Sequence, residues 1–467
     1  MILQYFQTLQ NCLKVGELRS RIFFTLMLLV VCRLIAMTPI PGLDGVALTE
    51  FFDDLRGSGE SGGLVGMYSM FTGGALERCA VGSLGIMPYI SATIIIQLMT
   101  AVVPSLSKLS REEGGRTQII KYGRYLTVLL CLGQGFVMSI GWENPGRIPG
   151  FEAFNGELVA DPGLWYRIRT MMLLTTGTVV LMWLGEQISE RGIGNGISLV
   201  ITVGIIARVD QAIMGIKEMF WPVGQVGAHP SKGIILVVLL LAVVGVVIAV
   251  TQAMRKIPVQ YAQRNVGRKM YQGGTTYFPL RVNYAGVMPI IFAQAILMFP
   301  SQILGTLGGA LGGHESSLGD FLINLGGALA YGTAWNLLMQ SLMILFFSYF
   351  WVATQFNETQ IADDLKKAGG YIPGVRPGNA TRDFLHHAMS RLTLAGAIFL
   401  VVIAVIPTVL ARPDVANIPF PVAQFFGGTS LLIMVGVMLD TMRQVESHLA
   451  QHHYDGFLKS GKVRGRS

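Results

Sequence analysis

Long apolar runs with few charges recur along this chain from residue 21 to residue 439. A helix needs about 20 apolar residues to cross the hydrocarbon core of a bilayer, and it satisfies its own backbone hydrogen bonds there. The composition agrees, because 52% of the 467 residues are hydrophobic and only 13% are charged. Soluble domains carry about 25% charged residues, and disordered chains are poor in apolar ones. We therefore predict an all-α polytopic membrane protein.

The apolar runs predict ten membrane spans, five in each half of the chain. The first run follows Lys14, Arg19 and Arg21 like a signal peptide, but no small-residue cleavage site follows it, so we expect it to be retained. Five plus five spans suit two pseudo-symmetric halves, at residues 21–220 and 221–440. The predicted spans are about 21–37, 80–103, 125–141, 170–185, 196–220, 233–254, 283–304, 331–352, 392–410 and 420–439.

The distribution of basic residues predicts the orientation of these spans. The net charge is +8, and cytoplasmic loops of membrane proteins carry an excess of Lys and Arg. With the N-terminus inside, 25 of the 35 Lys and Arg fall on the inner segments. Both termini are therefore predicted to be cytoplasmic, including the tail at residues 441–467. Residues 1–20 have apolar side chains at helical spacing and predict an amphipathic inner-surface helix, with a partly ordered terminus as the alternative.

The outer segment between the first two spans contains a short apolar piece at about residues 64–75. This piece is too short to span a bilayer, and segments of its length are usually re-entrant, interfacial or buried in protein. Gly73 and Gly74 at its end would provide a hinge. We expect a small mobile element that folds into the bundle from outside, and an outer loop on the surface is the alternative.

Two inner loops, at about residues 253–283 and 353–385, are longer than the topology requires and are basic. Such loops suit docking of an acidic partner, such as RNA or anionic lipid. The inside excess of positive charge is the competing explanation for their composition.

The chain lacks the motifs of an enzyme or a metal site. It has no GxxxxGK[ST] or HExxH motif, and its histidines and four cysteines show no metal-ligand spacing, so we predict no catalysis, no cofactor and no metal. Arg33 is the clearest charge inside a predicted span, with Arg208 and Asp210 near the outer half of the fifth. Ion-coupled carriers usually keep ionisable groups at mid-membrane, so this scarcity argues against such a carrier.

Five segments carry a specific resemblance. FTGGAL occupies residues 71–76, LGIMPYISATIIIQL 84–98, ERGIGNGIS 190–198, PGVRPG 373–378 and FGGTSLLI 426–433. In their residues, their order and their place in the predicted spans, these segments resemble the SecY family of channel subunits of the bacterial Sec translocon. The resemblance extends over roughly residues 16–445. The resemblance implies a clamshell of two five-helix halves with a short re-entrant plug.

The resemblance also implies roles for particular residues. The implied plug includes Leu64, Val65, Met67, Tyr68, Met70, Phe71, Gly73 and Gly74. The implied ring of apolar side chains at the channel waist is Ile86, Ile90, Ile197, Ile201, Ile205, Ile291 and Ile433. A branched aliphatic collar would dewet, block ions and deform around a passing chain. By spacing alone, these isoleucines would be interpreted as ordinary packing.

Further implied positions concern a lateral gate and docking. Ser91, Gln97 and Phe299 would face a gate between spans 2–3 and 7–8, where buried Gln97 needs a hydrogen-bond partner. Arg255, Lys256, Arg264 and Arg376 would dock the SecA ATPase or the ribosome. The chain departs from the family pattern at Lys256, Gln263, Ala295 and Glu358-Thr359.

The implied function is a passive protein-conducting channel in the bacterial plasma membrane. Unfolded precursor proteins bearing signal peptides would cross the ring, and transmembrane segments would leave sideways into the lipid bilayer. SecE and SecG are the implied membrane partners, and SecA or the ribosome supplies the driving force. From the residues alone two other classes stay open. One is a secondary transporter for a small solute, and the other is a receptor that docks ribosomes without conducting.

Overall fold

The computed structural model describes residues 15–57, 69, 72–112, 114–145, 154, 156–221, 230–261, 264–266, 269–271, 274–310, 316–329, 333–412 and 418–460. The predicted amphipathic segment before residue 15, and most of the predicted plug, lie outside these ranges. The chain divides into two compact units. The first contains residues 1–227, 305–319 and 433–467, and the second contains residues 228–304 and 320–432.

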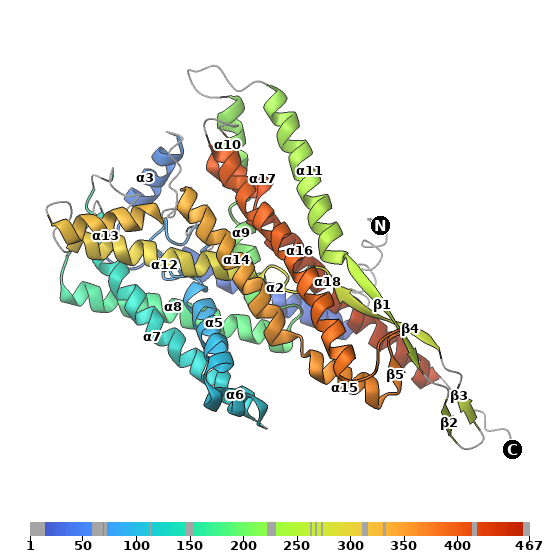
Figure 1. The fold of residues 1–467 in the computed structure, drawn as a ribbon. Helices are drawn as coiled ribbons and strands as arrows, with labels where there is room; N and C mark the ends of the chain where they lie inside the picture. The colour runs from blue at the N-terminus through green and yellow to red at the C-terminus, as the bar shows by residue number, and fades with distance from the viewer. Residues whose placement is uncertain are drawn as a thin grey trace. The chain divides into compact units, whose positions relative to one another are not determined.

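Helices make up the described part of the first unit. Helices α7 and α8 lie side by side, α5 packs on α7, and α2 and α9 pack on α8 (Figure 1). Gly135 of α7 suits this close packing, because a Cβ there would lie 3.4 Å from the Cα of Met171 on α8. The helices before residue 227 are α2 (Gly16–Met37), α3 (Gly45–Gly57), α5 (Met87–Val102), α6 (Pro104–Arg111), α7 (Gly115–Glu143), α8 (Leu164–Arg191), α9 (Gly196–Ile206) and α10 (Val209–Phe220).

The second unit combines helices with a small sheet. Helix α14 packs on α16, and α16 packs on α15 and α17. Its helices are α11 (Pro230–Gln252), α14 (Ala334–Gln355), α15 (Glu358–Lys367), α16 (Asn379–Ala411) and α17 (Phe420–Gly427). Three helices run from one unit into the other, namely α12 (Met288–Ala310), α13 (Ser317–Ala328) and α18 (Thr429–Ser460).

The two predicted inner loops contribute strands to one three-stranded sheet in the second unit. Strand β1 pairs with β4 from Met254↔Arg281 to Gln260↔Thr275, and it pairs with β5 at Gln260↔Tyr371, so the order is β4-β1-β5. The strands are β1 (Met254–Tyr261), β4 (Thr275–Arg281), β5 (Gly370–Tyr371) and a separate hairpin of β2 (Arg264–Val266) and β3 (Lys269–Tyr271). Segments about 100 residues apart in the sequence therefore share one fold element.

The second predicted span differs from the structure. A continuous helix over residues 80–103 is wrong, because residues 81–86 form turns and α5 begins at Met87. Gly85 has a left-handed φ of +58°, and Pro88 stands in the first turn, where its missing N–H loses no hydrogen bond. Pro104 then ends the helix, and α6 continues at an angle of 103°. The fifth predicted span is likewise divided, into α9 and α10, around Arg208.

Eight helices of the described part are long and apolar enough to cross a membrane, or nine if the bent pair α5–α6 is one span. Each of the ten predicted spans overlaps a described helix, and the number ten stays a prediction. Helix α11 shows why a membrane is needed, because Ile234, Val238 and Leu241 are 59–68% exposed on it. A large exposed apolar face of this kind indicates contact with lipid or with another membrane protein.

Candidate functional site

Six of the seven isoleucines assigned to the ring are buried. Ile86 is the N-cap of α5 and Ile90 lies in its first turn, where the Ile90 N–H donates to the carbonyl of Ile86 over 3.2 Å. Ile197 is partly exposed, and its Cγ1 lies 3.5 Å from the point that a Cβ on Gly185 of α8 would occupy. The buried members of the first unit are Ile86, Ile90, Ile201, Ile205 and Ile433, and the buried member of the second unit is Ile291 on α12. A ring closed by both units stays a prediction.

A small pocket of about 30 Å³ lies beside the ring positions of the first unit. Arg33 of α2, Ile86 of α5 and Gly204 of α9 line it with other apolar residues. Thr72 and Gly85 also line it, and they belong to the described residues 69 and 72–85, which we call the turn segment. A space of this size holds one or two water molecules. The pocket therefore connects the first ring position with the end of the predicted plug.

Both predicted hinge glycines have backbone conformations that favour glycine. Gly73 has a φ of +66° and Gly74 a φ of +83°. The Nη1 of Arg33 donates a hydrogen bond of 2.9 Å to the carbonyl of Gly73. A Cβ on Gly73 would stand 2.6 Å from that Nη1 and 3.0 Å from the Cα of Gly204. The hinge is therefore held between α2 and α9, and the charge in the first predicted span holds it there.

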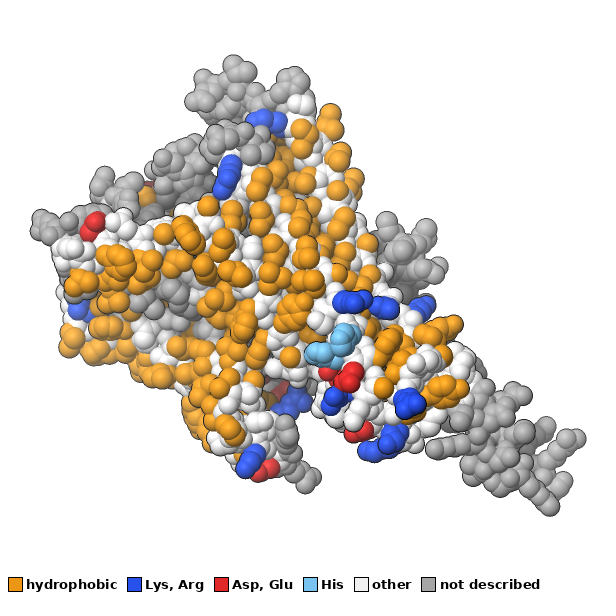
Figure 2. Space-filling view, viewed as in Figure 1, with side chains coloured by type: hydrophobic (Ala, Val, Ile, Leu, Met, Phe, Trp, Pro, Cys, Tyr) orange, Lys and Arg blue, Asp and Glu red, His pale blue; other side chains and the backbone are white. Residues whose placement is uncertain are grey.

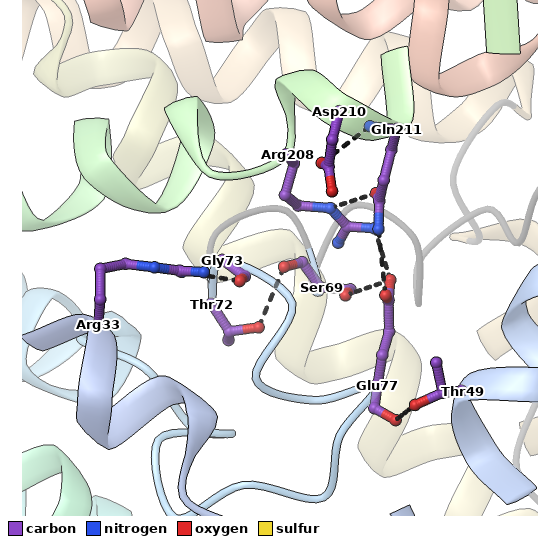
Figure 3. A network of polar contacts seen from close by, with 9 residues as sticks. All are labelled: Arg33, Thr49, Ser69, Thr72, Gly73, Glu77, Arg208, Asp210 and Gln211. Atoms are coloured by element: carbon purple, nitrogen blue, oxygen red, sulfur yellow. Dashed lines mark hydrogen bonds and ion pairs between the residues drawn. The ribbon is translucent and has the colours of Figure 1, made fainter. Parts of the chain in front are cut away.

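A second set of polar contacts lies a few residues further along the turn segment (Figure 3). Glu77 Oε1 accepts hydrogen bonds from Arg208 Nη2 at 2.5 Å and from the Ser69 hydroxyl at 2.6 Å. Gln211 Nε2 donates to Glu77 Oε2 at 3.2 Å, and Arg208 Nε donates to Gln211 Oε1 at 2.6 Å. The side chains of Arg208 and Glu77 are only 11% and 6% exposed. We call Ser69, Glu77, Arg208 and Gln211 the Glu77 network.

Sequence analysis did not single out Glu77 or Ser69. It noted Arg208 as a charge near the outer half of the fifth span but gave it no partner. The available signal was Glu77 itself, a carboxylate that follows Leu76 and, with Arg78, interrupts an otherwise apolar stretch. A carboxylate buried in such a sequence needs a charged or hydrogen-bonding partner, and that requirement would have directed attention to Arg208.

The turn between α8 and α9 explains the ERGIGNGIS motif. The backbone N–H of Ile193 donates to the Thr25 hydroxyl of α2 at 3.1 Å, and that of Gly194 donates to the Gln444 side chain of α18 at 2.8 Å. Asn195 caps α9 by accepting from the N–H of Ser198 at 3.3 Å. A Cβ on Gly196 would overlap the Gly185 carbonyl at 1.9 Å. The motif thus joins three helices by close backbone approach.

The gate positions are only partly described. Ser91 is buried on α5, and its hydroxyl makes no hydrogen bond to any described residue. Gln97 is half-buried rather than buried, and within the described ranges no hydrogen bond to it is found. Phe299 lies in α12, but its side chain lies outside the described part, as does that of Ala295. The gate therefore stays a prediction.

Three of the predicted docking residues are exposed on the second unit. Arg255 and Lys256 begin β1, and Arg376 lies in the turn after β5. The side chain of Arg264 in β2, and Gln263, lie outside the described part. Figure 2 shows charged side chains gathered over the sheet and α15, with Asp and Glu among the Lys, Arg and His, whereas hydrophobic side chains cover the long helices.

A common hydrophobic core fixes the positions of these strands. Ile257 and Val259 of β1, Leu280 of β4, Ile372 after β5 and Leu385 of α16 are all buried in it. Alternate residues of β1 point into this core and the others are exposed. The departure at Glu358 is accommodated nearby, because its carboxylate contacts His386 Nδ1 at 2.9 Å.

Comparison with known proteins identifies the family. The family model described as SecY matches residues 80–442. The protein translocase subunit SecY of Chlamydia trachomatis serovar D is 40% identical, over 98% of this chain and 99% of that protein. The SecY of Escherichia coli K12 is 40% identical over 96% of each chain. The chain belongs to the SecY family.

Solved structures agree with SecY membership at the level of the fold. A structure described as a protein conducting channel has a TM-score of 0.57 at 17% identity, and it covers 92% of each chain. Sec61 in the canine ribosome-channel complex has a TM-score of 0.54 at 16% identity, over 92% of each chain. The resemblance to the SecY family and the predicted helical membrane fold are therefore confirmed.

Proposed function

We propose that this chain is the protein-conducting channel subunit of a Sec translocon. SecY membership over nearly the whole chain carries this conclusion, and the described geometry supports it. Buried isoleucines without fixed polar partners suit a site that passes many different sequences, because hydrogen-bonding groups would select among them. Such a collar resists the passage of water and ions when no chain fills it.

The described turn segment supports the plug assignment. It enters at Ser69, bends at Gly73 and Gly74, and reaches α5 beside Ile86. Residues 64–75 would close the channel from outside and swing away as a secretory chain enters. Transmembrane segments would leave sideways between spans 2–3 and 7–8. Neither step is chemical catalysis, since a channel lowers a barrier to passage without making bonds.

The driving force comes from partners in this proposal. The chain has no phosphate-binding GxxxxGK[ST] motif of its own. Arg255 and Lys256 on the sheet, and Arg376 in the turn that follows β5, are exposed and suit contact with an acidic surface, which SecA or the ribosome would supply. SecE and SecG would be its membrane partners. The excess of basic residues in the inner loops supports a cytoplasmic position for this sheet and for both termini, in a bacterial plasma membrane.

Export by reconstituted vesicles tests the channel. The vesicles contain this chain with SecE, together with SecA, ATP and a precursor bearing a signal peptide, and the readout is precursor protected from protease. We expect protection that requires both SecA and ATP. The proposal is wrong if correctly inserted protein gives no protection of precursor while a positive-control channel does so in parallel. That result would favour a transporter of small solutes.

A deletion of residues 64–75 tests the plug separately. We expect the deleted channel to leak ions in the absence of precursor while it still protects precursor with SecA and ATP. Protection without an ion leak would leave the channel in place and remove the plug assignment.

A further inference from the structure

We propose that the Glu77 network is a latch that holds the segment after the plug against the junction of α9 and α10, and so sets how readily the closed channel opens. The inference rests on the proposed channel function and concerns residues to which that function assigns no role. Glu77 and Ser69 belong to the turn segment, whereas Arg208 and Gln211 belong to the start of α10.

The geometry of the contacts indicates a specific set of hydrogen bonds around Glu77 rather than a chance ion pair. Both oxygens of the Glu77 carboxylate are used, because Oε1 accepts from Arg208 and Ser69 and Oε2 accepts from Gln211. Arg208 also donates to Gln211, so the charged pair and the amide hold one another in place. Hydrogen bonds with an ionised partner are stronger and more directional than neutral ones.

Burial gives the latch its strength. The two charged side chains are 11% and 6% exposed, so little solvent screens them. Removal of one partner leaves an uncompensated buried charge, and that state is strongly unfavourable. While all four members stay in contact, the closed position is favoured, and any movement of the turn segment away from α10 has to separate the charges.

The location of the latch gives it control over the plug. Ser69 and Thr72 are described residues on the plug side of the hinge, and the Ser69 carbonyl accepts the N–H of Gly74 at 2.8 Å. On the other side of the hinge, the Thr49 hydroxyl donates to the carbonyl of Glu77 at 3.1 Å. Thr49 of α3 and the Glu77 network therefore hold both sides of this hinge, and displacement of the plug about the hinge breaks the Ser69–Glu77 hydrogen bond. An ion pair also re-forms readily after a chain has passed. It specifies the closed position more closely than apolar packing alone would.

Neutralisation of either charge tests the latch in the full complex. Glu77→Gln and Arg208→Gln channels are reconstituted with SecE, and resting ion conductance is measured without precursor. We expect each variant to raise the resting leak about tenfold, the shift in population that corresponds to about 1.4 kcal/mol. The double variant should leak no more than either single one, because both remove the same contact.

A matched control comes from a second ion pair of the first unit. Arg167 of α8 contacts Glu143 of α7 at 2.6 Å, and the Glu143 side chain is 5% exposed. Glu143→Gln therefore removes an equally buried carboxylate away from the hinge, and we expect no added leak. SecA-driven protection of precursor, measured on every variant, shows that the channel is folded. An unchanged leak in active Glu77→Gln channels would overturn the latch.

The deletion of residues 64–75 separates the two proposals. If the deletion leaks and Glu77→Gln does not, the plug stands and the latch is refuted. If neither leaks, the plug assignment and the latch fail together. Gln211→Ala removes only the hydrogen bonds of the neutral amide. Its ion leak should lie between the leak of the unsubstituted channel and that of Glu77→Gln.

Discussion

At the scale of single residues, the hinge shows how one glycine differs from its neighbour. Gly73 and Gly74 both have positive φ values, which non-glycine residues adopt at a cost. A Cβ on Gly73 would also collide with Arg33 and Gly204, whereas a Cβ on Gly74 would meet nothing within 4 Å. The sequence predicted a hinge at this pair, but the difference between the two glycines depends on what α2 and α9 place against them.

Substitution of the two glycines by alanine should separate these effects. Gly74→Ala is expected to lower the free energy of unfolding by about 1 kcal/mol, the cost of a left-handed alanine. Gly73→Ala should cost more and raise the resting ion leak, because the added Cβ displaces Arg33. Thermal unfolding in detergent and conductance of vesicles measure the two quantities. Equal unfolding temperatures for the two variants would contradict the close packing of Gly73 against Arg33 and Gly204.

Cys79 offers a second residue-scale prediction. It is fully buried, and burial, with a smaller contribution from Asp44, raises the pKa of its thiol to about 12. At pH 8 only about one thiol in 10⁴ is then ionised, against roughly a quarter of exposed thiols with a pKa of about 8.5. Iodoacetamide at pH 8 should leave Cys79 unmodified in the native protein and modify it after unfolding, as mass spectrometry of its peptide would show. Rapid native modification would contradict this burial.

At the scale of elements, the α8–α9 turn shows how close approach of backbones explains a sequence motif. Gly196 faces the Gly185 carbonyl at a distance that admits no side chain, and Asn195 caps the helix that follows. The motif was recognisable in the sequence. Its physical reason was not, because Gly185, Thr25 and Gln444 come from elsewhere in the chain.

Two substitutions in this turn should differ greatly in effect. Asn195→Ala removes one capping hydrogen bond and should cost about 1 kcal/mol. Gly196→Ala forces α9 away from α8 and should cost several times more, since overlap with backbone cannot be relieved by a side-chain movement. Unfolding midpoints in detergent, or the yield of folded protein, would reveal the order. A Gly196→Ala variant as stable as Asn195→Ala would show that the turn relaxes.

At the scale of the whole molecule, each unit brings together residues that are distant in sequence. The inner sheet pairs β1 with β5 and places Arg255 and Arg376 on structures that share one core. Sequence analysis treated the two inner loops as separate basic loops and could assign docking residues only by resemblance. A shared sheet gives a physical reason to test the two arginines as one surface.

Charge reversal on this sheet should weaken the binding of SecA. Arg255→Glu and Arg376→Glu are each expected to reduce affinity about tenfold or more, with a smaller effect at high salt because exposed charges are screened. Arg116→Glu, at the exposed start of α7, is the control with an identical change of charge. Equal losses for all three variants would indicate attraction by net charge rather than docking at the sheet.

The sequence alone determined the environment, the helical class and the family of this protein. Apolar runs of about 20 residues leave a chain few alternatives to membrane helices, and the motifs are long enough to specify SecY. Tertiary structure decided where helices stop and which charges meet. Gly85 and Pro88 divided a run that hydrophobicity alone presented as continuous, and Pro104 follows its end. Glu77 and Arg208 lie 131 residues apart, and only folding shows that two buried charges are partners, because pairing depends on position in space and not on local sequence.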